Sequence, residues 1–228
     1  VKAWASRDKQ AFSDTMKLVS KTGFLLLAIP TSPVMYELDG LLHLWLTNVP
    51  EHAKNFILLI LLYSLVNVFA YPLVYAVQAT GRIALFESLG SSIRILVFPL
   101  AWIALACGAP PEAAFAIIIM ITATCLLVRF LIFAHLVQIE KCAFIWDVYG
   151  KMALVCVLAQ CAPLLIMLAL PQSFFRMIIT GTTSAIWTGA CWYALALSKE
   201  QKNQVIEAIK GLFHRIFANL RQSQTEMP

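Results

Sequence analysis

Residues 112–136 read EAAFAIIIMITATCLLVRFLIFAHL, and the one charge in the interior of this apolar run, Arg129, lies close to its end. A continuous apolar stretch of this length matches the roughly 20 residues that an α-helix needs to cross the hydrocarbon core of a bilayer. Five further stretches of this kind occur in the 228-residue chain, so the sequence predicts six spans. We place them at about 17–37, 55–78, 84–107, 112–136, 149–170 and 173–197.

The composition agrees with a membrane protein. The hydrophobic fraction is 61% and the mean hydropathy is +0.80, whereas a soluble domain is about 45–50% apolar. Backbone groups in lipid must bond to one another, and runs this continuously apolar do so as helices rather than as the alternating strands of a barrel. The predicted fold class is therefore all-α, with six transmembrane helices.

Basic residues are distributed unevenly between the predicted loops. If the N-terminus is cytoplasmic, 14 of the 17 Lys and Arg residues fall on the cytoplasmic side and only Lys54 and Arg176 on the other. The 14 are Lys2, Arg7, Lys9, Lys17, Lys21, Arg82, Arg129, Lys141, Lys151, Lys199, Lys202, Lys210, Arg215 and Arg221. This asymmetry predicts that both termini are cytoplasmic. Arg94 fits neither side, because it lies near the middle of the third span.

Several function classes lack support in the residues. The net charge of +5 is explained by topology and anionic lipid, so no nucleic-acid partner is expected. The six cysteines form no C-x-x-C pair and the four histidines have no ligand-like neighbours at helical spacing, so no metal or cofactor is expected. There is no Walker A loop, no H-E-x-x-H and no G-x-S-x-G, which argues against an enzyme.

The chain divides into three parts. Residues 1–16 are a cytoplasmic lead-in that opens at Val1, and we expect an upstream part to be missing; residues 17–198 form the transmembrane domain. Residues 199–228 form a basic tail with apolar residues at three- and four-residue steps, namely Val205, Ile209, Leu212, Phe213, Ile216 and Leu220. This pattern predicts an amphipathic helix on the cytoplasmic leaflet, with a solvated tail as the alternative.

Prolines and charges refine the first span and its outer loop. Pro30 and Pro33 predict a kink or break in the outer half of the span. The residues after it, from Tyr36 to His52, are acidic and aromatic, so we expect an extracytoplasmic loop that contains Glu37 and a short interfacial helix around Trp45.

Arg94 is the first candidate for a substrate-binding residue. A cation at the centre of a bilayer costs at least about 2.5–3.5 kcal/mol, so it should face protein or water and have a partner. Glu87 lies two helical turns earlier on a face continued by Gly90 and Ser91, and it is the expected partner. The pair predicts a site for an anionic substrate group or for ion coupling; the alternative is a pair that only stabilises the bundle.

The second span carries another polar face, since Ser64, Asn67, Tyr71, Tyr75 and Gln78 follow steps of three and four residues. Such a row can line a wet cavity and bind sugar hydroxyls or phosphate oxygens, or it can bridge helices in a dry interface. Pro72 within it predicts a kink.

Other polar residues within the spans favour structural roles. Arg129 is expected to snorkel to the cytoplasmic interface. Gln160 is expected to form an interhelical hydrogen bond, and Gly181, Ala185 and Gly189, flanked by Thr180, Ser184 and Thr188, a helix-packing face.

Taken in order, the segments AWASRDKQAF, LLHLWLTNVPEHA, PLVYAVQATGRIALFESLG, VFPLAWIALACGAPPEAAF and VRFLIFAHLV resemble the C-terminal half of bacterial polysaccharide flippases. These belong to the multidrug/oligosaccharidyl-lipid/polysaccharide exporter superfamily. The most specific pieces are LWL-x-x-VP at Leu44–Pro50 and the turn QATGR at Gln78–Arg82. The resemblance covers nearly the whole chain.

The resemblance implies two six-helix lobes around a central cavity, with two extra C-terminal helices, and places this chain as the last six helices. The implied function is to move undecaprenyl-pyrophosphate-linked oligosaccharide across the bacterial inner membrane, for O-antigen or capsule synthesis. The implied partners are that lipid-linked substrate, membrane lipid and the missing N-terminal helices. A chain with half of the cavity should not transport alone.

Two other functions stay open. A multidrug exporter of the same superfamily would need an exposed intramembrane acid for its cationic substrate, and Glu87 is the only candidate. A membrane enzyme acting on lipid-linked sugars would need a general base or acidic metal ligands. Its candidates by residue type, without motif spacing, are Glu37, Asp39, Glu51, Glu140 and Asp147.

Overall fold

The structure is a computed structural model that describes residues 9–81, 83–203 and 205–207, and within these ranges it contains helices and no strand. The all-α prediction is confirmed. Five helices or helix pairs are long and apolar enough to cross a membrane: Gln10–Trp45, Ala53–Thr80, Phe86–Ala106, Glu112–Val137 and Lys141–Ala169. The described chain is thus typical of a multi-pass membrane protein.

The helices are α2 (Lys9–Trp45), α3 (Ala53–Asn67), α4 (Ala70–Thr80), α5 (Ile83–Ile95), α6 (Val97–Ala106), α7 (Glu112–Val137), α8 (Lys141–Ile145), α9 (Lys151–Ala159), α10 (Cys161–Ala169) and α11 (Phe174–Cys191). Two π-helical turns, η1 (Trp146–Gly150) and η2 (Trp192–Ala196), continue α8 and α11. The predicted amphipathic tail lies mostly outside the described residues, although residues 199–203 and 205–207 are helical.

Three of the spans are interrupted, between α3 and α4, between α5 and α6, and between α9 and α10, and a proline accounts for each of these breaks. Proline has no N–H for the carbonyl four residues earlier, and its ring clashes with that carbonyl. Pro72, Pro99 and Pro163 stand four residues after Val68, Ile95 and Ala159, which are the positions where α3, α5 and α9 end or have just ended. The kink predicted at Pro72 is confirmed as an interruption of the helix.

The prediction of a break in the first span is wrong, because α2 runs without interruption through Pro30 and Pro33. Helix α2 also continues to Trp45, so the loop expected to begin near Tyr36 is limited to residues 46–52. Within this stretch the hydroxyl of Thr31 donates to the carbonyl of Leu27 at 2.7 Å. The predicted extracytoplasmic loop is therefore mostly the last turns of α2.

The fifth span also begins earlier than predicted. Helix α8 starts at Lys141, and η1 and α9 follow it directly, so the connection from α7 consists of residues 138–140 only. Gln138 makes the turn with a positive φ of 59°. Residues 137–148, which separate the predicted fourth and fifth spans, are thus mostly helical.

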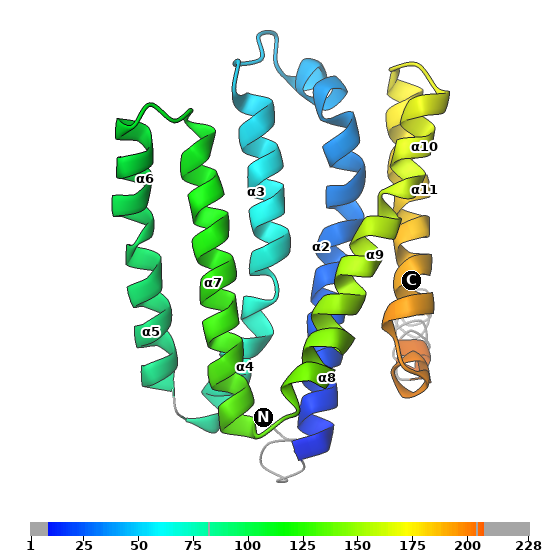
Figure 1. Cartoon of the computed structure of the whole chain (residues 1–228). Coiled ribbons are helices and arrows are strands. Elements are labelled where there is room, and N and C mark those ends of the chain that lie inside the picture. Colours follow the sequence, from blue (N-terminus) through cyan, green and yellow to red (C-terminus); the bar gives the residue numbers. More distant parts are fainter. Residues whose placement is uncertain (1–8, 82, 204, 208–228) are drawn as a thin grey trace, which may run out of the picture.

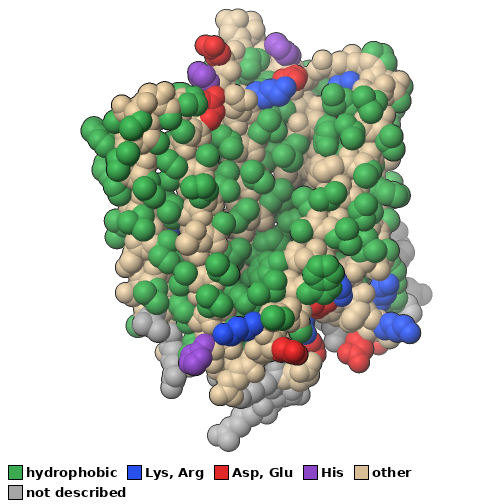
Figure 2. Space-filling view, viewed as in Figure 1, with side chains coloured by type: hydrophobic (Ala, Val, Ile, Leu, Met, Phe, Trp, Pro, Cys, Tyr) green, Lys and Arg blue, Asp and Glu red, His purple; other side chains and the backbone are tan. Residues whose placement is uncertain are grey.

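The helices stand side by side in an extended row (Figure 1). Helices α5 and α6 pack against α7, α7 against α3, α3 against α2, and α2 against α9, α10 and α11. The N-terminal end of α2 and the C-terminal end of α11 lie at the same end of the bundle, the lower end in Figure 1. Figure 2 shows charged side chains gathered at the two ends and a hydrophobic band between them.

The sixth predicted span corresponds to α11 and η2, which run alongside α2. Its sequence contains Arg176 and several Gly, Ser and Thr residues, and it is not among the helices apolar enough to qualify as a span. Five of the six predicted spans are therefore matched by long apolar helices.

Aromatic rings fill the core near the lower half of the row. The Phe24 and Phe69 rings stack with centroids 5.2 Å apart, and Tyr149 packs edge-on against Phe69 at 5.1 Å and against Phe130 at 5.8 Å. Edge-to-face and offset rings at these distances attract each other beyond their buried area. This cluster joins α2, the start of α4, α7 and η1.

Candidate functional site

Arg94 occupies the last turn of α5, in the middle of the span that α5 and α6 form together. Its side chain is exposed, and it makes no ion pair or hydrogen bond within the described part of the chain. Glu87, Ser91 and Arg94 recur at steps of four and three residues, so they lie on one flank of the helix. We call these three residues the polar flank of α5.

The predicted partnership between Arg94 and Glu87 is not formed, because Glu87 pairs with Arg129 of α7 instead. The Oε2 atom of Glu87 lies 2.9 Å from Nη2 of Arg129. The guanidinium of Arg129 also lies over the Phe86 ring, 4.9 Å from its centroid. Arg129 is buried, with 4% of its surface exposed, so the expectation that it snorkels to the interface is wrong.

Gly90 explains why Arg129 can reach across to α5. A Cβ atom at position 90 would lie 2.7 Å from both Nε and Nη2 of Arg129, closer than real contacts allow. The glycine thus leaves room for the guanidinium between α5 and α7. Since Arg129 compensates Glu87, the charge of Arg94 is the one that remains unbalanced on the polar flank.

The predicted stripe of the second span is divided by the interruption between α3 and α4. Tyr71, Tyr75 and Gln78 are exposed on one face of α4. Asn67, at the end of α3, is partly buried and its Oδ1 atom has no hydrogen-bond partner among the described residues. Ser64 donates to the carbonyl of Ile60 in its own helix. The structure therefore offers the two tyrosines and Gln78, rather than the whole row, to a ligand.

A buried ion pair that the sequence did not predict joins α2 to α11. Both Nε and Nη2 of Arg176 donate to Oε2 of Glu37, at 3.3 and 2.9 Å, and Thr180 donates to Oε1 at 3.0 Å. Both charged residues are less than a tenth exposed. The prediction that Glu37 lies in a loop, rather than in α2, concealed this pairing.

A second network joins α2, η1 and the residues after η2 at the opposite end. Nζ of Lys21 donates to Asp147 at 2.9 Å and to Gln201 at 3.2 Å, and Asp147 also pairs with Lys151. The indole of Trp192 donates to the carbonyl of Lys21. Three of the carboxylates considered for an enzyme, Glu37, Asp39 and Asp147, are thus in ion pairs, Asp39 with Lys54.

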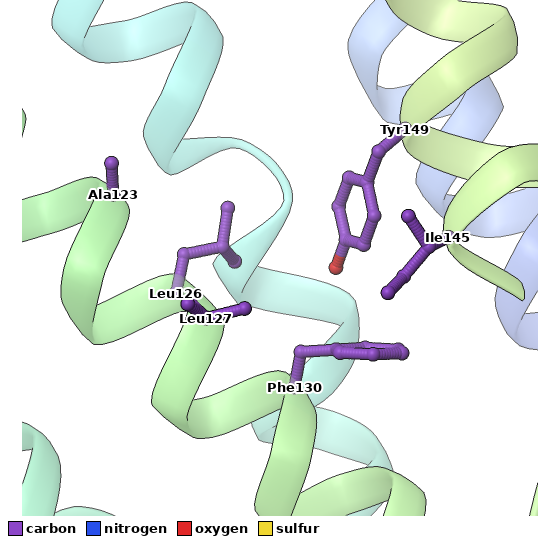
Figure 3. Close-up of a pocket in the computed structure, with 6 residues that line it drawn as sticks. All are labelled: Ala123, Leu126, Leu127, Phe130, Ile145 and Tyr149. Atoms are coloured by element: carbon purple, nitrogen blue, oxygen red, sulfur yellow. The ribbon is translucent and has the colours of Figure 1, made fainter. Parts of the chain in front are cut away.

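An apolar groove opens between α7 and the start of the fifth span (Figure 3). It has a volume of about 160 Å³ and is lined by Ala123, Leu126, Leu127, Phe130, Ile145 and Tyr149. The Tyr149 ring extends from η1 toward α7 across this groove. A groove lined in this way can accept a hydrocarbon chain but offers almost no polar contact.

At the N-terminal end of α7, Glu112 accepts hydrogen bonds from His52 at 2.7 Å and Asn55 at 3.0 Å. No group of three or more His, Cys, Asp or Glu side chains that could hold a metal occurs in residues 9–81, 83–203 and 205–207.

Comparison with protein families, with curated proteins and with solved structures finds no match for this chain.

Proposed function

We propose that this chain forms part of a flippase that moves undecaprenyl-pyrophosphate-linked oligosaccharide across a bacterial inner membrane. The proposal starts from the sequence resemblance to polysaccharide flippases and takes its termini as cytoplasmic. The observation that carries it is the exposed, uncompensated Arg94 within an apolar span.

Energetics favour a polar environment for Arg94. Placing a guanidinium against lipid tails at mid-membrane costs at least about 2.5–3.5 kcal/mol. The cost is avoided if the polar flank of α5 faces a wet cavity, which in this proposal is completed by the N-terminal helices of the flippase. Arginine also suits a pyrophosphate, because its planar fork donates two parallel hydrogen bonds to phosphate oxygens.

The remaining candidates take secondary roles in the proposal. Tyr71, Tyr75 and Gln78 on the exposed face of α4 are suited to sugar hydroxyls. Asn67 contributes to substrate binding if a movement of α3 relative to α4 brings the substrate to its Oδ1 atom, which has no hydrogen-bond partner among the described residues. Glu87 holds Arg129 and shapes the flank rather than touching substrate.

Ion pairs make the two alternative functions, a multidrug exporter and a membrane enzyme, less suitable. A cationic drug would meet an acid already neutralised by Arg129 and beside it a second cation, Arg94. A membrane enzyme would have to use carboxylates of which Glu37, Asp39 and Asp147 are occupied by ion pairs.

The test uses Arg94→Ala and Arg94→Lys in the full-length protein, in cells that depend on it for export of the repeat unit. A hydrogen bond to a charged group contributes about 1.5–3 kcal/mol, so Arg94→Ala should reduce export by about tenfold or more, and Arg94→Lys by less. Ile95→Ala, at the neighbouring exposed position, is the matched control and should leave export unchanged. Unchanged export by Arg94→Ala at a normal protein level would contradict the proposal.

A further inference from the structure

A small cavity lies between α2, the junction of α9 and α10, and α11, away from the polar flank of α5. Its volume is about 10 Å³, and Ala28, Ser32, Leu65, Ala159, Gln160 and Thr188 are among its lining residues. About one water-sized probe fits a space of 10–15 Å³. The cavity is therefore of the size that holds a single small molecule.

Two hydroxyls that line this cavity lack partners. Oγ of Ser32 on α2 and Oγ1 of Thr188 on α11 form no hydrogen bond with the described residues. Ser32 is 2% exposed and Thr188 is fully buried. A helical Ser or Thr usually donates to the carbonyl four residues earlier, as Thr31 does beside Ser32. A buried hydroxyl without a hydrogen-bond partner is destabilising, so a partner in the cavity is favoured.

The other polar groups around the cavity narrow the choice of partner. Thr31 donates to Leu27, and the Gln160 amide donates to the carbonyl of Cys156 at 3.0 Å. Pro163 has no N–H for the carbonyl of Ala159, a lining residue four positions earlier. No carboxylate lines the cavity. Burying an ion without an opposite charge is expensive, so a neutral partner with both donors and acceptors fits best.

We infer that this cavity binds one water molecule, which bridges Ser32 of α2 and Thr188 of α11. The water accepts from or donates to each hydroxyl, and it has a further donor available for the carbonyl of Ala159. It joins α11 to α2 at a level between the Glu37–Arg176 pair and the hydrogen bond from the Trp192 indole to the carbonyl of Lys21. The contact between α2 and the continuous segment α11–η2 is thus tied at three levels: by the Glu37–Arg176 pair, by the water, and by the hydrogen bond from the Trp192 indole to the carbonyl of Lys21.

The first test measures thermal unfolding of the full chain in nanodiscs for Ser32→Ala, Thr188→Val and the double variant. If a water bridges the two hydroxyls, each single variant leaves it without one partner and lowers Tm by about 2–4 °C. The double variant should then lower Tm by less than the sum of the two, because the groups act through one molecule. Thr182→Val, at an exposed Thr bonded to its own helix, is the matched control and should barely change Tm.

A raised Tm for Thr188→Val would overturn the inference, since removing an unpaired hydroxyl from a dry site stabilises a protein. Strictly additive losses would also overturn it. Equal Tm values in sodium, potassium and choline chloride at one ionic strength are expected; a sodium-specific gain lost in Thr188→Val would show a cation instead of water.

A direct measurement keeps the inference testable if a variant fails to fold. Solid-state NMR of the wild-type protein in lipid should show fast magnetisation transfer from water to the Thr188 side chain. Transfer to the exposed but lipid-facing Ile186 serves as the background. Transfer to Thr188 no faster than to Ile186 would overturn the bridge.

Discussion

At the scale of single residues, the ion-pair partner of Glu87 determines which side chains the candidate site offers to a ligand. The sequence placed Glu87 and Arg94 on one helical face, and they do lie on one flank of α5. It could not show that Arg129 of α7 reaches the same carboxylate, because that contact depends on which helices are neighbours and on the space above Gly90. The mid-span position of Arg94 was predictable from the sequence, whereas the partner of Glu87 was not.

Gly90 gives a test of the Arg129 contact. In Gly90→Ala the new methyl group would lie 2.7 Å from the Arg129 guanidinium, so that side chain must shift and weaken its bond to Glu87. We expect unfolding in mixed micelles to become easier by about 1–3 kcal/mol. Gly181→Ala is the matched control: it is a helical glycine with open space around it, so it should be neutral or stabilise by up to about 1 kcal/mol. Equal effects at both positions would contradict the contact.

At the scale of helices, hydrophobic length predicted the positions of the spans, because the bilayer requires a fixed length of apolar helix. Pro72 correctly predicted an interruption, yet Pro30 and Pro33 did not interrupt α2. Proline removes one hydrogen bond everywhere, but neighbouring helices and hydroxyls decide whether the helix continues. In α2 these neighbours are α11, α9 and α3, none of which a single sequence places.

The packing face predicted for α11 is formed only in part: the flanking Thr180, Ser184 and Thr188 are fully buried. The predicted glycine ridge does not pack closely, because a Cβ atom at Gly181 or Gly189 would meet nothing within 4 Å. What the sequence missed is the charge pair that attaches this polar helix to α2. Glu37 was assigned to a loop because acidic residues near an apolar run usually mark its end. Burial of the pair follows from the continuation of α2 past that point.

The Glu37–Arg176 pair predicts a large loss of stability when one partner is neutralised. Glu37→Gln leaves the buried guanidinium of Arg176 uncompensated, so the free energy of unfolding in mixed micelles should fall by about 3–5 kcal/mol. Asp39→Asn, two residues further along α2, removes an exposed ion pair with Lys54 and should cost no more than about 1 kcal/mol. If Glu37→Gln is as mild as Asp39→Asn, the pair does not tie α11 to α2.

At the scale of the whole molecule, the row of helices leaves α5 and α6 packed mainly against α7, with most of their side chains exposed. This exposure is what makes Arg94 available in the proposed flippase. Which helices lie next to each other in the row depends on how their side chains fit together. The apolar pattern of the sequence alone therefore did not predict the order of the helices. Orientation was predicted from the basic residues, and the proposed flippase takes both termini as cytoplasmic on that ground.

The most direct measurement is sided labelling of single-cysteine variants with a membrane-impermeant maleimide. Cys107 and Cys142 are both exposed and lie at opposite ends of the bundle, and Glu200→Cys adds an exposed position after η2. Intact cells should label Cys107 only, whereas Cys142 and Glu200→Cys should react only after the membrane is permeabilised. Labelling of Cys142 or Glu200→Cys in intact cells, or protection of Cys107, would contradict a bundle whose N- and C-termini are both cytoplasmic.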